Sequence, residues 1–184
     1  MIDLETINSI YFDFDGVFTD NTVTSDSSGN EWIKCSKYDS MGLTILKNYI
    51  YIKDLDISLS VITSEANISV GKRCKKLGLN VAQDINNKKE YIMMNLRKRN
   101  PNTNIENELK KSIFLGNDLN DLGAIKACGY SFVPSDSHPI IKREATVTLT
   151  RKGGDGFIRE FIEYILPLED IDSELLDQLI YTKI

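Results

Sequence analysis

Two aspartates, Asp13 and Asp15, are the first residues in the chain whose types and spacing could do chemistry. They end a segment, residues 9–15, whose β-branched and aromatic side chains are typical of a core strand. Alternation along a strand places both acids on one side of it. Two carboxylates buried side by side need a cation or a proton. Gly16 then ends the strand, so we expect the acids at its carboxyl end, where open α/β sheets bind ligands. A plainer interpretation also fits, in which Asp15 caps a turn and Asp13 is solvated.

Two further polar residues stand where later strands end or helices begin. Thr63 closes the apolar run ISLSVIT, and its hydroxyl with the following amides could hold a phosphoryl oxygen at a helix N-terminus. An ordinary helix cap is the alternative. Lys88 opens a predicted helix, where a lysine opposes the helix dipole and so suggests an anionic ligand. An ordinary surface lysine is the alternative there.

The stretch LGNDLND, residues 115–121, adds Asn117, Asp118 and Asp121 beside the position expected for the first strand. Asp13, Asp15 and Asp118 would then converge as hard oxygen donors, which suits a magnesium ion that keeps several waters. Asn117 and Asp121 would support this site. Asp121 falls three residues into a predicted helix and could equally be only a helix cap.

The elements that must position these residues alternate along the chain. Apolar runs predict strands at residues 9–15, 57–63, 79–82, 112–116 and 129–133. Helical patterns separate them at residues 41–53, 66–77, 88–99, 120–127 and 154–165. This alternation predicts an α/β, Rossmann-like fold, with a mostly parallel sheet and helices on both faces. The polar stretch 98–111 is expected to be a surface loop.

Composition narrows the possible functions. The chain has 184 residues, which favours one domain over residues 1–184. Its net charge of −5 gives no general attraction to nucleic acid or to an acidic membrane, so we expect neither as a partner. Cys35, Cys74 and Cys128 lack metal-ligand spacing and are interpreted as reduced thiols. With no secretory leader or membrane span visible, a cytoplasmic location is expected.

Two segments depart from the alternation. Residues 21–36 contain two β-type runs around a turn signal, which predicts a hairpin inserted after the first strand. It could cover the site or pair with another subunit, with Trp32 at the interface or packed on its own domain. Residues 152–184 are expected to form a C-terminal tail. Its KGGDGFIRE stretch permits close backbone approach before a helix begins near Phe157, and an apolar helical stripe follows at Ile171, Leu175, Leu176, Leu179 and Ile180.

Together these motifs resemble a known family. DFDGVFTD, Thr63, Lys88 and GNDLND resemble, in this order, the four motifs of the haloacid dehalogenase superfamily. The hairpin, YDSMG at residues 38–42 and KGGDGFIRE resemble its capless subgroup, which dephosphorylates 3-deoxy-2-ulosonic acid phosphates. That subgroup includes octulosonate 8-phosphate and nonulosonate 9-phosphate phosphatases. Related domains occur fused to sialic acid cytidylyltransferases.

The resemblance implies a magnesium-dependent phosphomonoesterase with no cap domain. Asp13 would attack phosphorus and form an aspartyl phosphate, while Asp15 would serve as general acid and then general base. Thr63 and Lys88 would hold the transferring group. Magnesium would be bound by Asp13, the main-chain carbonyl of Asp15, and Asp118. The resemblance also implies a homotetramer, in which a mobile glycine-rich tail covers a neighbouring subunit's site.

Departures from the subgroup bear on the substrate. Octulosonate enzymes usually carry Thr-Gly-Arg where this chain has Thr63-Ser64-Glu65, and often Arg-Asp-Gly where it has Tyr38-Asp39-Ser40. Glu65 with Arg73 and Lys76 resembles the nonulosonate type, so a nine-carbon, sialic-acid-type 9-phosphate is the expected substrate. Substrate contacts are expected from Ser64, Glu65, Arg73, Lys76 and Arg159, although Arg159 could instead pair structurally.

Three alternatives stay open. The substrate could be 3-deoxy-manno-octulosonate 8-phosphate (KDO 8-phosphate) or another small sugar phosphate. The chain could also be a non-catalytic oligomerisation domain related to those of the sialic acid cytidylyltransferases. Such a domain would be expected to have lost at least one of Asp13, Asp15, Lys88 and Asp118, whereas all are present.

Overall fold

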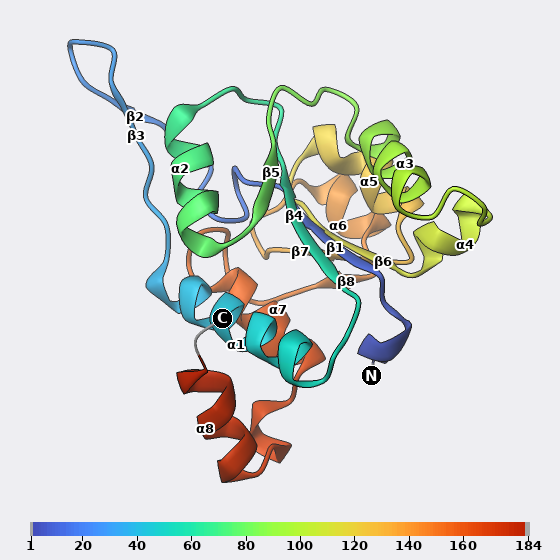
Figure 1. Cartoon of the computed structure of the whole chain (residues 1–184). Helices are drawn as coiled ribbons and strands as arrows, with labels where there is room; N and C mark the ends of the chain where they lie inside the picture. Colours follow the sequence, from blue (N-terminus) through green and yellow to red (C-terminus); the bar gives the residue numbers. More distant parts are fainter. Residues whose placement is uncertain (1, 183–184) are drawn as a thin grey trace.

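A six-stranded parallel sheet forms the centre of the computed structural model, which describes residues 2–182 (Figure 1). The strands lie in the order β5-β4-β1-β6-β7-β8. Their bounds are β1 Ser9–Phe12, β4 Ser58–Ile62, β5 Asn80–Ala82, β6 Ser112–Leu115, β7 Tyr130–Val133 and β8 Val147–Thr148. The Rossmann-like α/β fold predicted from the sequence is therefore confirmed.

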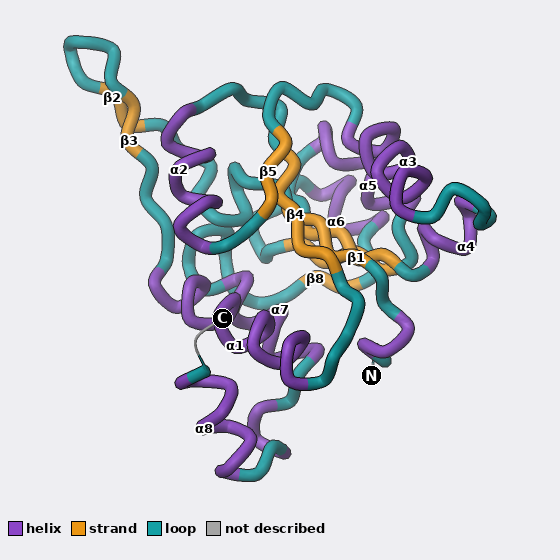
Figure 2. The backbone as a smooth tube through the Cα atoms, in the orientation of Figure 1, coloured by secondary structure: helices purple, strands orange, loops and turns teal. Residues whose placement is uncertain are grey.

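Helices cover both faces of the sheet (Figures 1 and 2). The helices form two groups, one on each face of the sheet. Helices α1, α2, α7 and α8 cover one face, and α3, α4, α5 and α6 cover the other. Their bounds are α1 Lys37–Ile52, α2 Ile68–Leu77, α3 Lys88–Arg99, α4 Ile105–Lys110, α5 Leu122–Ala127, α6 Pro139–Glu144, α7 Phe157–Ile165 and α8 Ser173–Tyr181. Three short 3-10 helices complete the set, η1 Leu4–Thr6, η2 Leu119–Asp121 and η3 Leu168–Asp170.

The alternation of β1 explains why each face has its own core. Ile10 and Phe12 pack into the cluster beneath α1 and α7, whereas Tyr11 packs into the cluster beneath α3 and α5. All three side chains are fully buried. A strand buried on both faces reads as a continuous apolar run, as this segment of the sequence does.

The C-terminal segment is not a peripheral tail throughout, and this corrects the expectation of a mobile tail. Phe157, Phe161 and Ile162 of α7 are fully buried in the core on the α1 side. Phe161 stacks edge-on against Phe12 of β1 and Phe132 of β7. The predicted helix at residues 154–165 is confirmed from Phe157 onward, but its place in the core was not predicted. The apolar stripe follows α7: Ile171 comes directly after η3, and the other four residues lie on α8, which packs against α1.

Other differences from the sequence prediction follow from short or polar elements. The stretch 98–111 was expected to be a loop, but it contains α4, whose Asn104 caps the helix by accepting from the amide of Glu106. Strand β8 has two residues and α6 has six, too few for a periodic signal. Within residues 2–182, none of the helices combines the length and the apolar character needed to cross a bilayer.

The inserted segment forms two short antiparallel strands, β2 Thr24–Ser25 and β3 Glu31–Trp32. Figure 2 shows them projecting from the body of the molecule. Trp32 is 65% exposed, so in this chain it does not pack on its own domain. The side chain of Asn67, which caps α2, donates to Glu31 at 2.9 Å and ties the base of the hairpin to that helix.

Candidate active site

The site lies at the carboxyl ends of the three central strands. Strand β1 pairs in parallel with β4 on one side and β6 on the other. Asp13 follows β1, Thr63 follows β4, and Asn117 follows Gly116 at the end of β6. Because parallel strands end at one edge of a sheet, residues far apart in sequence meet here.

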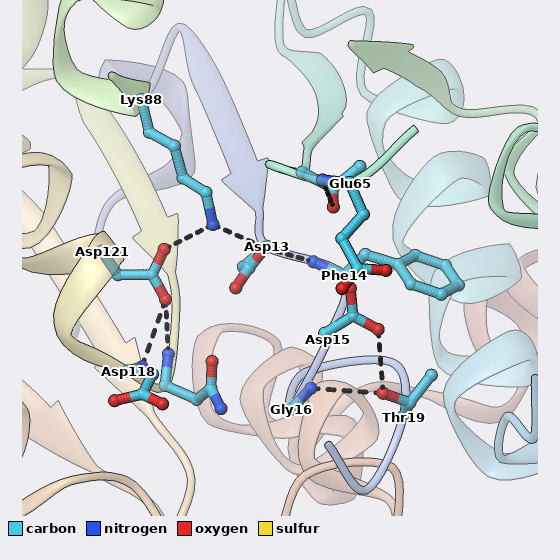
Figure 3. Close-up of polar contacts among 11 residues, drawn as sticks. Asp13, Phe14, Asp15, Gly16, Thr19, Glu65, Lys88, Asp118 and Asp121 are labelled. Carbon is cyan, nitrogen blue, oxygen red and sulfur yellow. Dashed lines mark hydrogen bonds and ion pairs between the residues drawn. The ribbon is translucent and has the colours of Figure 1, made fainter. Parts of the chain in front are cut away.

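Lys88, the first residue of α3, joins two buried carboxylates. Its ammonium nitrogen lies 2.6 Å from Asp13 Oδ1 and 2.7 Å from Asp121 Oδ1 (Figure 3). The other oxygen of Asp121 accepts the amides of Asn117 at 2.8 Å and Asp118 at 3.3 Å. Asp121 thus fixes both Lys88 and the loop after β6. It also closes a capping box with Asp118, so its predicted support and cap roles coexist.

Electrostatics in this cluster follow from the imbalance of its charges. Burial, followed by the negative charge of Asp121, raises the pKa of Asp13 well above its ordinary value. Burial alone would lower the pKa of Lys88, but the Asp13 and Asp121 carboxylates outweigh it and raise that pKa. Lys88 is therefore charged. One ammonium between two carboxylates leaves the cluster short of positive charge.

The Asp13 carboxylate has one engaged oxygen and one free oxygen. Oδ1 takes both the Lys88 contact and the amide of Phe14 at 2.7 Å. Oδ2 has no hydrogen bond or ion pair to any of residues 2–182. Asp13 also lines a cavity of about 330 Å³. Lys88 thus holds one oxygen of the carboxylate and leaves the other available to a ligand in the cavity.

That cavity brings together several of the predicted residues. Its lining consists of Asp13, Asp15, Asn21, Ser64, Glu65, Asn117, Asp118, Leu119 and Asn120. The sequence analysis missed Asn21, Leu119 and Asn120. Asn21 has a φ of 61°, a left-handed conformation that asparagine tolerates better than most residues. Its place directly after the DFDGVFTD motif was the available signal.

Asp15 lies beside Glu65 and apart from Asp118 (Figure 3), and all three line the cavity. Burial, and next the negative charge of Glu65, raise the pKa of Asp15. An acid whose pKa is raised keeps its proton more readily, which suits a proton donor. Glu65 itself is exposed at the rim.

Thr63 is buried behind this lining. Its hydroxyl oxygen accepts the amide of Glu65 at 3.1 Å, so the residue does act as a local cap. Ser64 and Glu65, the two residues after it, reach the cavity instead. Whether Thr63 and Lys88 touch a phosphoryl group stays a prediction.

The oxygen donors fit a hard divalent cation, although side chains alone do not complete a site. Among residues 2–182, no three His, Cys, Asp or Glu side chains gather closely enough to hold a metal ion. Asp13, Asp15 and Asp118 nevertheless border one cavity, beside a cluster in which one ammonium faces two carboxylates. Magnesium accepts few protein ligands and keeps waters, so this donor set fits it.

Three predicted substrate contacts lie elsewhere in the chain. Arg73 reaches from α2 to α1, where it donates to Ser40 Oγ at 2.6 Å. Lys76 is exposed one turn further along α2. Arg159 pairs with Glu163 at 2.6 Å within α7. None of the three lines the cavity that Glu65 borders.

No family model matches the chain. Among curated proteins, it is 28% identical over 170 residues to a 3-deoxy-D-manno-octulosonate 8-phosphate phosphatase of Haemophilus influenzae, covering 92% of this chain and 88% of that one. It is 24% identical over 174 residues to N-acylneuraminate cytidylyltransferase A of Danio rerio. That match covers 95% of this chain but 38% of the cytidylyltransferase.

Solved structures agree. A candidate HAD family hydrolase from Streptomyces avermitilis superposes with a TM-score of 0.81 at 27% identity, covering 95% of this chain and 94% of that one. The octulosonate 8-phosphate phosphatase of Moraxella catarrhalis, in complex with magnesium, phosphate and KDO, gives 0.77 at 26% identity and covers 89% and 88%. The cobalt-bound enzyme of Haemophilus influenzae gives 0.77 at 25% and covers 94% and 98%. Apart from the cytidylyltransferase, these proteins are named as octulosonate 8-phosphate phosphatases or as a HAD (haloacid dehalogenase) family hydrolase, and the predicted resemblance is confirmed.

Proposed function

We propose that the chain is a divalent-metal-dependent phosphomonoesterase that acts on an ulosonic acid phosphate. One observation carries the proposal: Asp13 is anchored through Oδ1 by Lys88 and keeps Oδ2 free toward a cavity that Asp15 and Asp118 share. A nucleophilic carboxylate, a neighbouring acid and a hard-cation site are the parts that phosphoryl transfer needs. The relatives named as octulosonate 8-phosphate phosphatases support the same class of substrate.

In this mechanism Asp13 Oδ2 attacks phosphorus, and the bond to the leaving alkoxide breaks. Asp15 gives its proton to that alkoxide and then takes a proton from the water that hydrolyses the aspartyl phosphate. Lys88 holds the Asp13 carboxylate in place. Bound magnesium would supply the positive charge that lets an anionic carboxylate approach an anionic phosphate. Asp13, Asp118 and the main-chain carbonyl of Asp15 would hold it.

The first test measures phosphate release from ulosonic acid phosphates with magnesium. Wild type should be active, excess chelator should abolish activity, and Asp13→Asn should be folded yet reduced by about 1000-fold or more, since it lacks the nucleophile. Asp177→Asn, at an exposed acid of α8 outside the cavity, is the control and should stay near wild type. Turnover that persists in chelator or in Asp13→Asn would contradict the proposal.

We further propose that a nine-carbon, sialic-acid-type 9-phosphate is preferred to the eight-carbon octulosonate 8-phosphate. Glu65 supports this, because it lines the cavity where an acid suits sugar hydroxyls better than a second anion. The match to an N-acylneuraminate cytidylyltransferase is consistent with a nine-carbon sugar context. Arg73 and Lys76, on one face of α2, would meet the substrate carboxylate only from a neighbouring subunit.

Substrate choice is tested by the ratio of kcat/KM for the nine-carbon and eight-carbon substrates. Wild type should favour the nine-carbon phosphate, and Glu65→Arg should lower that ratio by about tenfold, equivalent to about 1.4 kcal/mol of differential transition-state binding. Glu169→Arg, at an exposed acid of η3 outside the cavity, is the matched control. An eight-carbon preference in wild type, or an unchanged ratio in Glu65→Arg, would show that the assignment of Glu65 is wrong.

A non-catalytic domain is the second candidate, favoured by the match to part of a cytidylyltransferase. The same phosphate-release measurement separates the two, because a non-catalytic domain releases no phosphate.

We also propose a single-domain homotetramer in the cytoplasm. The exposed hairpin supports the assembly, and three free cysteines suit a reducing compartment.

A further inference from the structure

Thr19 is a buried residue that the proposed mechanism does not use, and its hydroxyl lies next to Asp15 (Figure 3). We propose that Thr19 is a positioning residue that aims the Asp15 carboxylate, and that the glycine-rich loop at Gly153 and Gly154 of the same chain holds Thr19 in place. The inference rests on the proposed function, because it assumes that Asp15 transfers the proton.

The hydroxyl group of Thr19 has one acceptor available for its hydrogen, the carboxylate of Asp15. Its oxygen accepts the amides of Gly16 at 3.2 Å and Asn21 at 3.3 Å. A hydroxyl has two acceptor lone pairs and one hydrogen, so both lone pairs are engaged. The remaining contact is to Asp15 Oδ1 at 3.5 Å. Thr19 is 3% exposed, so bulk water does not compete for that hydrogen.

Asp15 depends on this contact more than an ordinary carboxylate would. Within residues 2–182, Thr19 is the one group that donates a hydrogen bond to the Asp15 side chain. Lys88 binds Asp13 and Asp121 instead. Without Thr19, the Asp15 carboxylate would turn freely at the cavity wall, and proton transfer needs it within hydrogen-bond reach of the leaving oxygen.

The glycine-rich loop fixes the backbone on which Thr19 stands. The amide of Gly154 donates to the carbonyl of Val17 at 3.1 Å. A Cβ on Gly153 would lie 2.1 Å from the carbonyl oxygen of Gly16, and one on Gly154 would lie 2.5 Å from the carbonyl carbon of Thr19. No side chain fits at either position. The loop after Asp15 and the loop before α7 therefore fit together only because both glycines lack one.

A substrate pair distinguishes positioning of an acid from general loss of structure. A sugar alkoxide leaves poorly unless it is protonated, whereas p-nitrophenolate leaves without a proton. A misplaced Asp15 should therefore slow cleavage of the sugar phosphate more than cleavage of p-nitrophenyl phosphate. A merely structural defect slows both alike. The ratio of the two rate constants also does not depend on the fraction of enzyme that is folded.

The experiment compares Thr19→Val with Thr19→Ser in single turnovers with magnesium and excess enzyme. One reaction follows the sugar acid released from a nonulosonic acid 9-phosphate, and the other follows p-nitrophenol released from its phosphate ester. Thr19→Val, which keeps the shape but loses the hydroxyl, should lower the sugar-to-aryl rate ratio by about tenfold or more. Thr19→Ser, which keeps the hydroxyl, should stay within about threefold of wild type.

An equal ratio in wild type and Thr19→Val would overturn the positioning role. If the wild-type enzyme released phosphate from neither substrate, the proposed function would be wrong, and the inference with it.

The loop's contribution is tested with a pair of glycines of similar backbone. Gly154 has a φ of 67° and Gly29 has a φ of 77°, but a Cβ on Gly29 would meet nothing within 4 Å. Gly154→Ala should lower the same ratio in the same direction, while Gly29→Ala should leave it at the wild-type value. A wild-type ratio in Gly154→Ala, or an equal fall in Gly29→Ala, would refute the role of the loop.

Discussion

A single ammonium group, that of Lys88, faces the carboxylates of Asp13 and Asp121 in a buried cluster. Desolvation makes an uncompensated charge costly, so the cluster favours a further cation at the free side of Asp13. The same contacts hold Asp13 in one orientation. The contacts of Lys88 with Asp13 and Asp121 therefore explain both the shortage of positive charge and the fixed orientation of Asp13.

A second buried acid, Asp39 of α1, lies away from this cluster. It is 2% exposed, and its Oδ1 accepts the amide of Arg159 at 2.9 Å near the start of α7. Burial raises the pKa of Asp39 to about 6, and the nearby Asp155 acts in the same direction. Its ordinary pKa in an unfolded chain is about 3.9.

This shift predicts a pH dependence of stability. Between about pH 4 and pH 6 the folded chain binds the Asp39 proton more tightly than the unfolded chain, so the free energy of unfolding should fall as the pH rises through that window. A pKa difference of about two units between the folded and unfolded chain changes the free energy of unfolding by about 3 kcal/mol over that window. Asp39→Asn should gain stability relative to wild type between pH 4 and pH 7, as measured by urea unfolding. A constant difference between the two proteins across this range would contradict the prediction.

At the scale of elements, α8 depends on one polar contact with α1. The buried side chain of Asn48 donates to the carbonyls of Leu179 at 2.8 Å and Thr182 at 3.0 Å. These carbonyls at the end of α8 would otherwise lack intrahelical partners. A side chain from a neighbouring helix therefore caps α8 and docks it.

We predict that Asn48→Ala lowers the free energy of unfolding by about 1–3 kcal/mol, because two carbonyls lose their donor. Asn102→Ala, at an exposed loop position, should change it by less than about 0.5 kcal/mol. In a chain shortened to end at Leu166, which lacks α8, the Asn48 substitution should cost much less. An equal cost in the full and shortened chains would mean that the capping account of α8 is wrong.

The order of elements could be predicted from the sequence because β1, β4 and β6 are apolar runs that each precede a polar residue of the candidate site. Residues that follow these strands, such as Asp13 and Asn117, therefore meet at the carboxyl edge of the parallel sheet. Strand β8 and helix α6 could not be predicted, since neither is long enough to show a period. The core position of α7 depends on packing against α1, which no local pattern reports.

The site was predictable to the extent that each residue follows an element end. Thr19 was not, because its role depends on how a loop folds back onto Asp15 and on the distant Gly154. Arg73 and Lys76 were grouped with Glu65 on the basis of the resemblance. Within one chain the structure separates them, because the Arg73 side chain reaches α1 rather than the cavity.

At the scale of the whole molecule, the hairpin exposes more apolar surface than a solvated turn requires. Trp32 is 65% exposed and Val23 is 67% exposed on this projecting segment. Trp32 pairs directly with Thr24, so Val23, one residue earlier, points to the other face, and a partner chain that packed around the hairpin would cover both side chains. The predicted homotetramer would cover them and would bring the α2 cations of one subunit toward another subunit.

We predict that Trp32→Glu shifts the assembly toward monomers in sedimentation at assay concentration, because a charge would be buried at the interface. The nonulosonate 9-phosphatase activity should fall with it. Tyr51→Glu, at an equally exposed position on α1, should change neither assembly nor activity. A wild-type chain that sediments as a fully active monomer would refute the assembly.

Asp13 should carry the phosphoryl group during turnover, and mass spectrometry can detect that group. Wild type turning over a nonulosonic acid 9-phosphate with magnesium would be quenched in acid and digested. We expect a phosphoryl group on Asp13 in the quenched sample, and none in a sample quenched before substrate is added. Steady phosphate release without any phosphorylated Asp13, or a phosphoryl group on another residue, would contradict it.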